Sequence, residues 1–129
     1  MAGETDLDRM LATLDVERRA GTFTFVTGDW PALGSDAVAT IDEDEGRTFV
    51  VPVGSARVVG APVEFEAAWL TLTVHSALDA VGLTAAFGKA LADAGIACNV
   101  LAGYHHDHLL VPVDRSDEAV ALLRGLSSR

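Results

Sequence analysis

The segment of residues 69–113 constrains the fold most, because its hydrophobic period changes from that of a strand to that of a helix and back. It opens with apolar residues that alternate with polar ones, as in a half-buried strand: Leu70, Leu72 and Val74. Helical spacing then places apolar residues on one face: Leu83, Phe87, Ala90 and Ala94. Gly95 stands where a left-handed residue ends a helix. Two more alternations, in residues 96–100 and 109–113, predict a hairpin.

A strand, a helix and a hairpin in this order form one half of a ferredoxin-like fold. The apolar stripe of the helix must be buried, and the sheet offers the surface that can cover it. The sequence therefore predicts an α/β (α+β) protein with an antiparallel-rich sheet and helices mainly on one face.

A second apolar hairpin lies upstream. Each hairpin ends in the sequence Val–Pro–Val, and the two prolines, Pro52 and Pro112, are 60 residues apart. With that shift, residues 37–53 align with residues 97–113 without a gap. The upstream copy has the loop around Trp30 in place of the long helix. We interpret this as an internal duplication with one degenerate copy; chance similarity of two apolar hairpins is the alternative.

The duplication predicts tandem ferredoxin-like modules, at residues 1–63 and 64–129. The second module has no strand after its last helix, which we expect at residues 116–126. A strand from the N-terminal half could complete that sheet. The modules would then share strands and depend on each other for folding.

Local signals give further expectations for where the elements begin. Thr5 and Asp8 have capping-box spacing before a short amphipathic helix, and Ser76 and Asp79 repeat that spacing before the long helix. Asp79 could itself be the N-cap. Residues 64–75 could form one long strand.

Composition excludes several classes of function. The formal net charge is −10, whereas nucleic acids and anionic membranes require basic surfaces, so we expect neither as a partner. The polar, acidic start of the chain and the single cysteine favour a cytoplasmic location. Cys98 lies on a strand pattern and is expected to be a small buried apolar residue.

The stretch DAVGLTAAFGKALADAGIACNVLAGYHHDHLLVPV resembles the ACT domain, the small effector-binding module of amino-acid metabolism. The matching features are Gly82, the turn at residues 94–96, Asn99 and the loop from Tyr104 to Asp107. The chain most resembles small bacterial proteins of two ACT-like modules. It is more distantly similar to the paired ACT modules of aspartokinases and of the animal cytosolic arginine sensor.

This resemblance implies an amino-acid site at the entrance of the long helix, where Val81, Gly82 and Leu83 would contact the ligand backbone. A helix N-terminus has unpaired N–H groups and a partial positive charge, which suit a carboxylate. Glycine allows close approach of a ligand. Every helix has such an end, however, so Gly82 could instead serve packing alone.

The resemblance also implies that the following hairpin contributes Gly103, Tyr104 and Asp107 to the same site. An aspartate could select a cationic group through charge-assisted hydrogen bonds. Asn99, on the preceding strand, could bind the amino or carboxyl group of the ligand. The alternative is an ordinary polar turn in which Asp107 bonds local backbone. The adjacent histidines depart from the family pattern and leave the nature of the effector open.

The histidines also raise the question of a metal. His106 and His108 would share one face of a strand, and His105 and Asp107 the other. Two histidines can begin a zinc site, but Cys98 is the single soft ligand and there is no second cluster. We therefore expect no metal and no cofactor.

Catalysis is not indicated either, because no convergent nucleophile, acid and base are evident. Ser76 follows His75, but neighbouring strand residues point to opposite faces. The leading hypothesis is a regulatory protein, not an enzyme, that binds an amino acid or similar metabolite where the modules meet. It would act on a regulated protein in trans, as a monomer or a homo-oligomer such as a dimer. The alternative is an interaction or oligomerisation module whose ligand site is vestigial.

Overall fold

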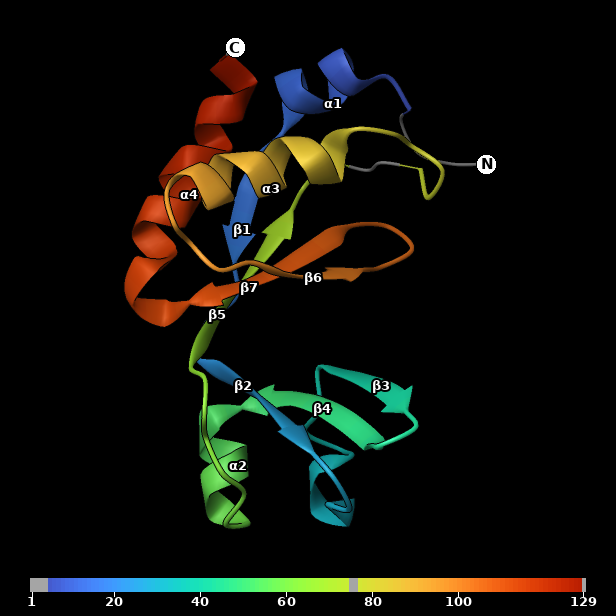
Figure 1. The fold of residues 1–129 in the computed structure, drawn as a ribbon, viewed down its shortest axis with the longest axis vertical. Coiled ribbons are helices and arrows are strands. Elements are labelled where there is room, and N and C mark those ends of the chain that lie inside the picture. The colour runs from blue at the N-terminus through green and yellow to red at the C-terminus, as the bar shows by residue number, and fades with distance from the viewer. Residues whose placement is uncertain (1–4, 75–76, 129) are drawn as a thin grey trace. The chain divides into compact units, whose positions relative to one another are not determined.

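The computed structural model describes residues 5–74 and 77–128, and its contacts divide the chain into two compact units (Figure 1). The larger unit comprises residues 1–19 and 68–129, and the smaller unit comprises residues 20–67. The larger unit contains, in chain order, α1 (Leu7–Thr13), β1 (Val16–Arg18), β5 (Ala67–Leu72), α3 (Leu83–Asp93), β6 (Asn99–Ala102), β7 (Asp107–Pro112), η2 (Val113–Arg115), α4 (Ser116–Gly125) and η3 (Leu126–Ser128). The smaller unit contains β2 (Phe23–Thr27), η1 (Pro31–Leu33), β3 (Ala39–Glu43), β4 (Gly46–Pro52) and α2 (Val53–Val58).

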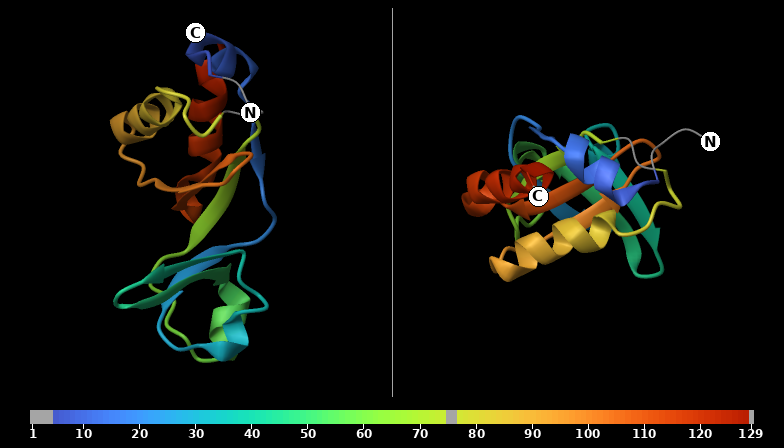
Figure 2. Two further views of the ribbon diagram at one scale, coloured as in Figure 1. Left: turned by 90° about the vertical axis from the view of Figure 1, so that its right-hand side faces the viewer. Right: turned by 90° about the horizontal axis from the view of Figure 1, so that it is seen from above.

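The strands of the larger unit lie in the order β1–β5–β7–β6. β1 is antiparallel to β5, and β6 is antiparallel to β7. The helices α1, α3 and α4 pack on one face of this sheet, where their apolar residues meet those of the strands (Figure 2). The predicted fold class, ferredoxin-like with helices mainly on one face, is confirmed for this unit.

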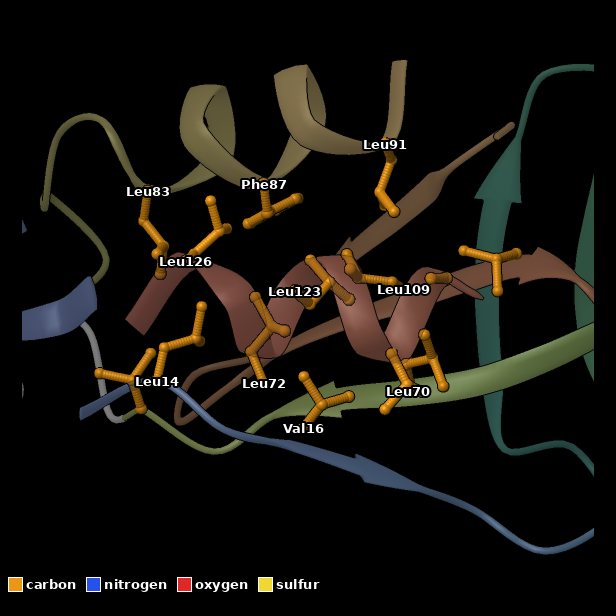
Figure 3. Close-up of a cluster of buried hydrophobic side chains, with 14 of the residues drawn as sticks. Leu14, Val16, Leu70, Leu72, Leu83, Phe87, Leu91, Leu109, Leu123 and Leu126 are labelled. Carbon is orange, nitrogen blue, oxygen red and sulfur yellow. The ribbon is translucent and has the colours of Figure 1, made fainter. Parts of the chain in front are cut away.

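The core of the larger unit forms where alternate strand residues meet the apolar stripes of the helices (Figure 3). The strands contribute Val16, Leu70, Leu72 and Leu109, and the helices contribute Leu83, Phe87, Leu91 and Leu123. Burial of such side chains contributes roughly 1.5–3 kcal/mol each. The predicted helical stripe and strand alternation therefore identify the core correctly.

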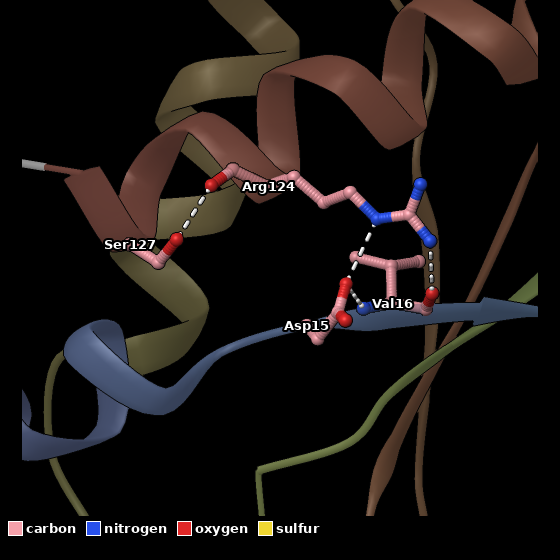
Figure 4. Close-up of polar contacts among 4 residues, drawn as sticks. All are labelled: Asp15, Val16, Arg124 and Ser127. Carbon is pink, nitrogen blue, oxygen red and sulfur yellow. Dashed lines mark hydrogen bonds and ion pairs between the residues drawn. The ribbon is translucent and has the colours of Figure 1, made fainter.

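The strand from the N-terminal half that closes this sheet is β1. Val16 pairs with Leu72, and Arg18 pairs with Leu70. The guanidinium of Arg124, on α4, donates to a carboxylate oxygen of Asp15 at 2.8 Å and to the carbonyl oxygen of Val16 at 3.0 Å (Figure 4). The guanidinium also holds the pKa of Asp15 below its ordinary value, mainly through their hydrogen bond. A strand from the start of the chain is thus tied to the last long helix.

The smaller unit has a sheet of order β3–β4–β2 and a core of its own. Trp30 lies in the loop between β2 and β3, where it packs partly against the buried Leu33 and Phe49 cluster. Its indole Nε1 donates to the carbonyl oxygen of Thr27 at 3.0 Å. In the smaller unit the loop around Trp30 stands where the larger unit has its long helix, and the Trp30 side chain covers part of the smaller sheet.

The hairpins of the two units have the register that the 60-residue repeat predicts. β3 begins at Ala39 and β6 at Asn99, while β4 ends at Pro52 and β7 at Pro112. Both prolines close their strands and precede a helical turn. Proline fits a strand end because it cannot donate to the ladder.

Several predicted boundaries are wrong by a few residues. The N-cap of α1 is Asp6, whose carboxylate accepts from the backbone N–H of Arg9 at 3.0 Å, and Thr5 lies outside the helix. The N-cap of α3 is Gly82 instead of Asp79. β5 begins only at Ala67. The predictions for His75 and Ser76 lie outside the described residues.

No helix in the described part of the chain combines the length and the apolar character needed to cross a lipid bilayer.

Truncation of Leu70 tests the core. Leu70 is fully buried on a central strand, so Leu70→Ala is expected to lower the free energy of unfolding by about 2–5 kcal/mol. Leu78→Ala removes the same atoms from a side chain that is 62% exposed and should change stability by about 0.5 kcal/mol or less. Urea unfolding measures both, and equal effects would contradict the assigned core.

The Asp15–Arg124 contact predicts a pH-dependent stability. A carboxyl group whose pKa is lowered by folding contributes stability above its unfolded pKa of 3.8, and the contribution is lost as pH falls through the folded pKa. Arg124→Gln should therefore lower the urea midpoint near neutral pH, and the difference from wild type should shrink in strong acid. High salt should also reduce the difference in urea midpoint between Arg124→Gln and wild type, because the Asp15–Arg124 pair is exposed. A difference that does not vary with pH would indicate that the pair contributes nothing.

Candidate functional site

The segment before α3 positions the first part of the candidate site. Gly82 caps the helix with a left-handed φ of +102° and contributes no side-chain hydrogen bond. A Cβ atom on Gly82 would lie 2.9 Å from Cδ2 of Leu7, which packs against this turn from α1. Glycine at this position is therefore explained by backbone conformation and by the approach of Leu7. The next residue, Leu83, is buried in the core.

The β6–β7 hairpin positions the second part. The backbone N–H of Gly103 donates to the carbonyl oxygen of His106 at 2.9 Å and closes the turn. A Cβ atom on Gly103 would lie 3.0 Å from that oxygen and 3.2 Å from Nε2 of His108. Because Gly103 has no side chain, the carbonyl oxygen of His106 and the imidazole of His108 can both approach it closely.

The two parts meet at a cavity of about 120 Å³ within the larger unit. The segment before α3 and the first turn of the helix contribute Ala77, Leu78, Ala80, Leu83 and Thr84, and the hairpin contributes Ala102, Gly103 and Asp107. Three predicted site residues, Leu83, Gly103 and Asp107, therefore line one cavity. Sequence reasoning missed Thr84, whose position in the first helical turn was the available signal.

Asp107 is the charged residue in the lining of this cavity. Burial raises the pKa of its carboxyl group, while the nearby His108 and His106 act to lower it. A carboxylate that is partly removed from water is stabilised by a cationic partner. The cavity therefore offers an acidic group on one side and a helix N-terminus on the other.

Other predicted site residues lie away from the cavity lining. Val81 is 80% exposed, and Tyr104 is 62% exposed with its ring edge-on to His105 at 5.0 Å. Asn99 pairs with Leu110, whereas Ala102 pairs with Asp107. Because Leu110 and Asp107 are three residues apart on one strand, Asn99 and Asp107 belong to opposite faces of the hairpin. Ligand contacts by these residues stay predictions.

The histidine-rich turn does not gather a metal site in residues 5–74 and 77–128, which contain no group of three or more potential His, Cys, Asp or Glu ligands. His108 is instead engaged with Thr71, whose Oγ1 lies 2.9 Å from its Nδ1. Cys98 packs against the core, and burial raises the pKa of its thiol. That environment disfavours the reactive thiolate.

The two units define a protein of paired ferredoxin-like modules. Family models described as the ACT domain match residues 2–68 and residues 64–125. The chain therefore belongs to the ACT-domain family, whose modules are regulatory rather than catalytic. The boundary predicted between residues 63 and 64 stays a prediction, as does the absence of enzymatic activity.

Solved structures agree with this assignment. A Vibrio cholerae protein of unknown function is 38% identical, with a TM-score of 0.84 over 94% of this chain and 95% of that chain. The regulatory subunit of aspartate kinase from Thermus thermophilus has a TM-score of 0.58 at 12% identity, over 86% of this chain and 95% of that one. A structure of aspartokinase α and β subunits has a TM-score of 0.63 at 13% identity, and the match covers 89% of this chain and 98% of that chain. These two more distant likenesses concern the fold alone. No curated protein matches the chain.

Gly82 and Gly88 provide a matched pair of substitutions around α3. Gly82→Ala should destabilise the protein by about 1–2 kcal/mol or more, because alanine is strained at positive φ and its Cβ would meet Leu7. Gly88 lies inside the same helix, and a Cβ added there would point into open space, so Gly88→Ala should stabilise the protein by up to about 1 kcal/mol. Thermal unfolding compares them, and a tolerated Gly82→Ala would contradict the described turn.

Proposed function

We propose that this protein is a small regulator that binds an amino acid or a similar small metabolite at the cavity beside Asp107. One observation carries the proposal: Leu83, Gly103 and Asp107, chosen from the sequence for ligand contact, line a common cavity. The membership in a family of regulatory modules supports a regulatory role.

The chemistry of the cavity suits the head group of an amino acid. The N-cap of α3 has no side-chain cap, so backbone N–H groups of the first turn are available to a carboxylate. Asp107 would accept hydrogen bonds from the ammonium group. A volume of about 120 Å³ corresponds to roughly four water molecules, which matches a head group more closely than a whole side chain. The ligand side chain would extend past the exposed Leu78.

Ligand binding would regulate by joining two segments that are distant in sequence. The segment before α3 and the hairpin end would both contact the ligand, so their relative arrangement would be stabilised in the bound state. A ligand shifts an equilibrium only by its differential affinity for the two states. A regulated protein that recognises the bound arrangement would receive the signal in trans.

A second candidate function, an oligomerisation module with a vestigial ligand site, is favoured by the exposed edge strands. β6 lies at one edge of the larger sheet with Val100 39% exposed, and β3 lies at the edge of the smaller sheet with Ile41 42% exposed. Open strand edges are templates for pairing with another chain. A second copy of this chain would pair along β6 or β3 to form a dimer.

A thermal-shift screen of the twenty amino acids tests the leading proposal. An effector at a hundred times its Kd should stabilise the protein by about 2.7 kcal/mol. Asp107→Asn should weaken binding of that effector at least about tenfold, because a hydrogen bond to a charged group contributes roughly 1.5–3 kcal/mol. Calorimetric titration measures the change in Kd.

Asp93→Asn is the matched control, since Asp93 is an exposed carboxylate on α3 that pairs with Lys89. It should leave the affinity unchanged. If no amino acid stabilises the protein, while light scattering shows a dimer that dissociates when charges are placed on β6 or β3, the oligomerisation function is supported instead.

A further inference from the structure

A second cavity lies on the face of the larger sheet that carries no helix. Leu70 and Leu72 of β5 point into the core, so the intervening Trp69 and Thr71 face the other way. With His108 of β7 they line a cavity of about 220 Å³, whose remaining lining comes from the neighbouring strand β1 and the residue that follows it: Glu17, Arg18 and Arg19. All of these residues belong to the larger unit.

A chain of hydrogen bonds connects three residues of the cavity lining. The indole Nε1 of Trp69 donates to Oγ1 of Thr71 at 3.2 Å, and Oγ1 of Thr71 lies 2.9 Å from Nδ1 of His108. The rings of Trp69 and His108 are 5.1 Å apart, and the guanidinium of Arg19 lies over the Trp69 ring at 5.8 Å. Thr71 therefore links the two aromatic residues.

The direction of the Thr71 hydroxyl depends on the proton of His108. While Nδ1 is unprotonated, it accepts the hydroxyl hydrogen. When Nδ1 carries a proton, Thr71 Oγ1 accepts from both Trp69 and His108, and its own hydrogen is released for another acceptor. Protonation of His108 thus adds a positive charge to the cavity, and from the neutral tautomer with unprotonated Nδ1 it also frees the Thr71 hydroxyl to donate to another acceptor.

We propose that this cavity is a second small-ligand site, which takes a small organic acid through its carboxylate group. Arg19 supplies a guanidinium, the group best suited to bind a carboxylate. Arg18 stands opposite the core residue Leu70, and its guanidinium bonds Asp117 of α4 at 2.7 Å on the helix face of the sheet. The guanidinium of Arg19 lies over the Trp69 ring that lines the cavity, so Arg19 is the principal cation on this face. A cationic ligand is disfavoured, because Arg19 already covers the Trp69 ring.

The charges around His108 make binding at this site depend on pH. Burial lowers the pKa of His108, as do His106 in the preceding turn and Arg19 after β1, while Asp107 acts to raise it. Glu17, which stands opposite Thr71, is the other charged side chain on this face, whereas the guanidinium of Arg18 lies at Asp117 of α4; Trp69 and Thr71 on β5 are uncharged. A carboxylate bound beside the imidazole would raise this pKa. By linkage, binding is tighter below the pKa of His108 and weakens as pH rises through it.

This site is separate from the proposed regulatory cavity, because the neighbouring residues Asp107 and His108 of β7 face opposite sides of the sheet. Loss of ligand binding at one is therefore distinguishable from loss at the other.

Titration of the histidine ring signals by NMR tests the proposal, with succinate as the probe and sodium chloride at equal ionic strength as the reference. Succinate should raise the pKa of His108 by about half a unit or more, which corresponds to about threefold tighter binding to the protonated form. Arg19→Gln should remove most of that increase. Thr71→Val should also reduce it, since the hydroxyl donor is lost.

Lys89→Gln, a charge removal at the exposed Lys89–Asp93 pair of α3, is the control and should leave the succinate effect intact. The same pKa of His108 in succinate and chloride overturns the proposal, as does a shift that persists in Arg19→Gln. A shift with tetramethylammonium chloride and none with succinate overturns the assignment of an acid. If Thr71→Val does not fold, the exposed Arg19→Gln variant still decides the outcome.

Discussion

The pairing of β1 with β5 is the contact on which the larger unit depends. β1 comes from the start of the chain, yet Val16 belongs to the same core as Leu72 and Leu123. The sheet is closed on that side only when this short strand is in place, and the hydrogen bonds from Arg124 to Asp15 and Val16 tie it to α4. Residues from both halves of the sequence must therefore come together before the core is complete.

The same sheet places two chemically different cavities on its two faces. Because strand residues alternate, β7 presents Asp107 to the helix side and His108 to the other side. The first cavity combines an acidic group with a helix N-terminus, and the second combines Arg19 with an imidazole. One strand thus supplies a polar group to each, and the apolar residues Leu109 and Val111 continue the same strand into the core.

The repeated hairpins share a backbone and differ in chemistry. In the 60-residue register the counterpart of Asp107 is Arg47, which is paired with Asp42 at 2.6 Å. The counterpart of the long helix is the loop that contains η1 and Trp30. The smaller unit therefore keeps the ACT-type hairpin without reproducing either the helix entrance or the acidic group of the larger one.

The sequence by itself determined the strand–helix–hairpin order, the core positions such as Leu70 and Phe87, and the repeat, because local periodicity records which side chains are buried. It also required a closing strand from the N-terminal half, which the structure identifies as β1. Its resemblance to the ACT domain indicated Leu83, Gly103 and Asp107. Only the tertiary structure decided that Leu7 packs on Gly82, that Asn99 belongs to the face opposite Asp107, and that Arg19, Thr71 and His108 share a cavity. Such contacts join residues far apart in sequence, and their geometry depends on strand order and register, which no local pattern encodes.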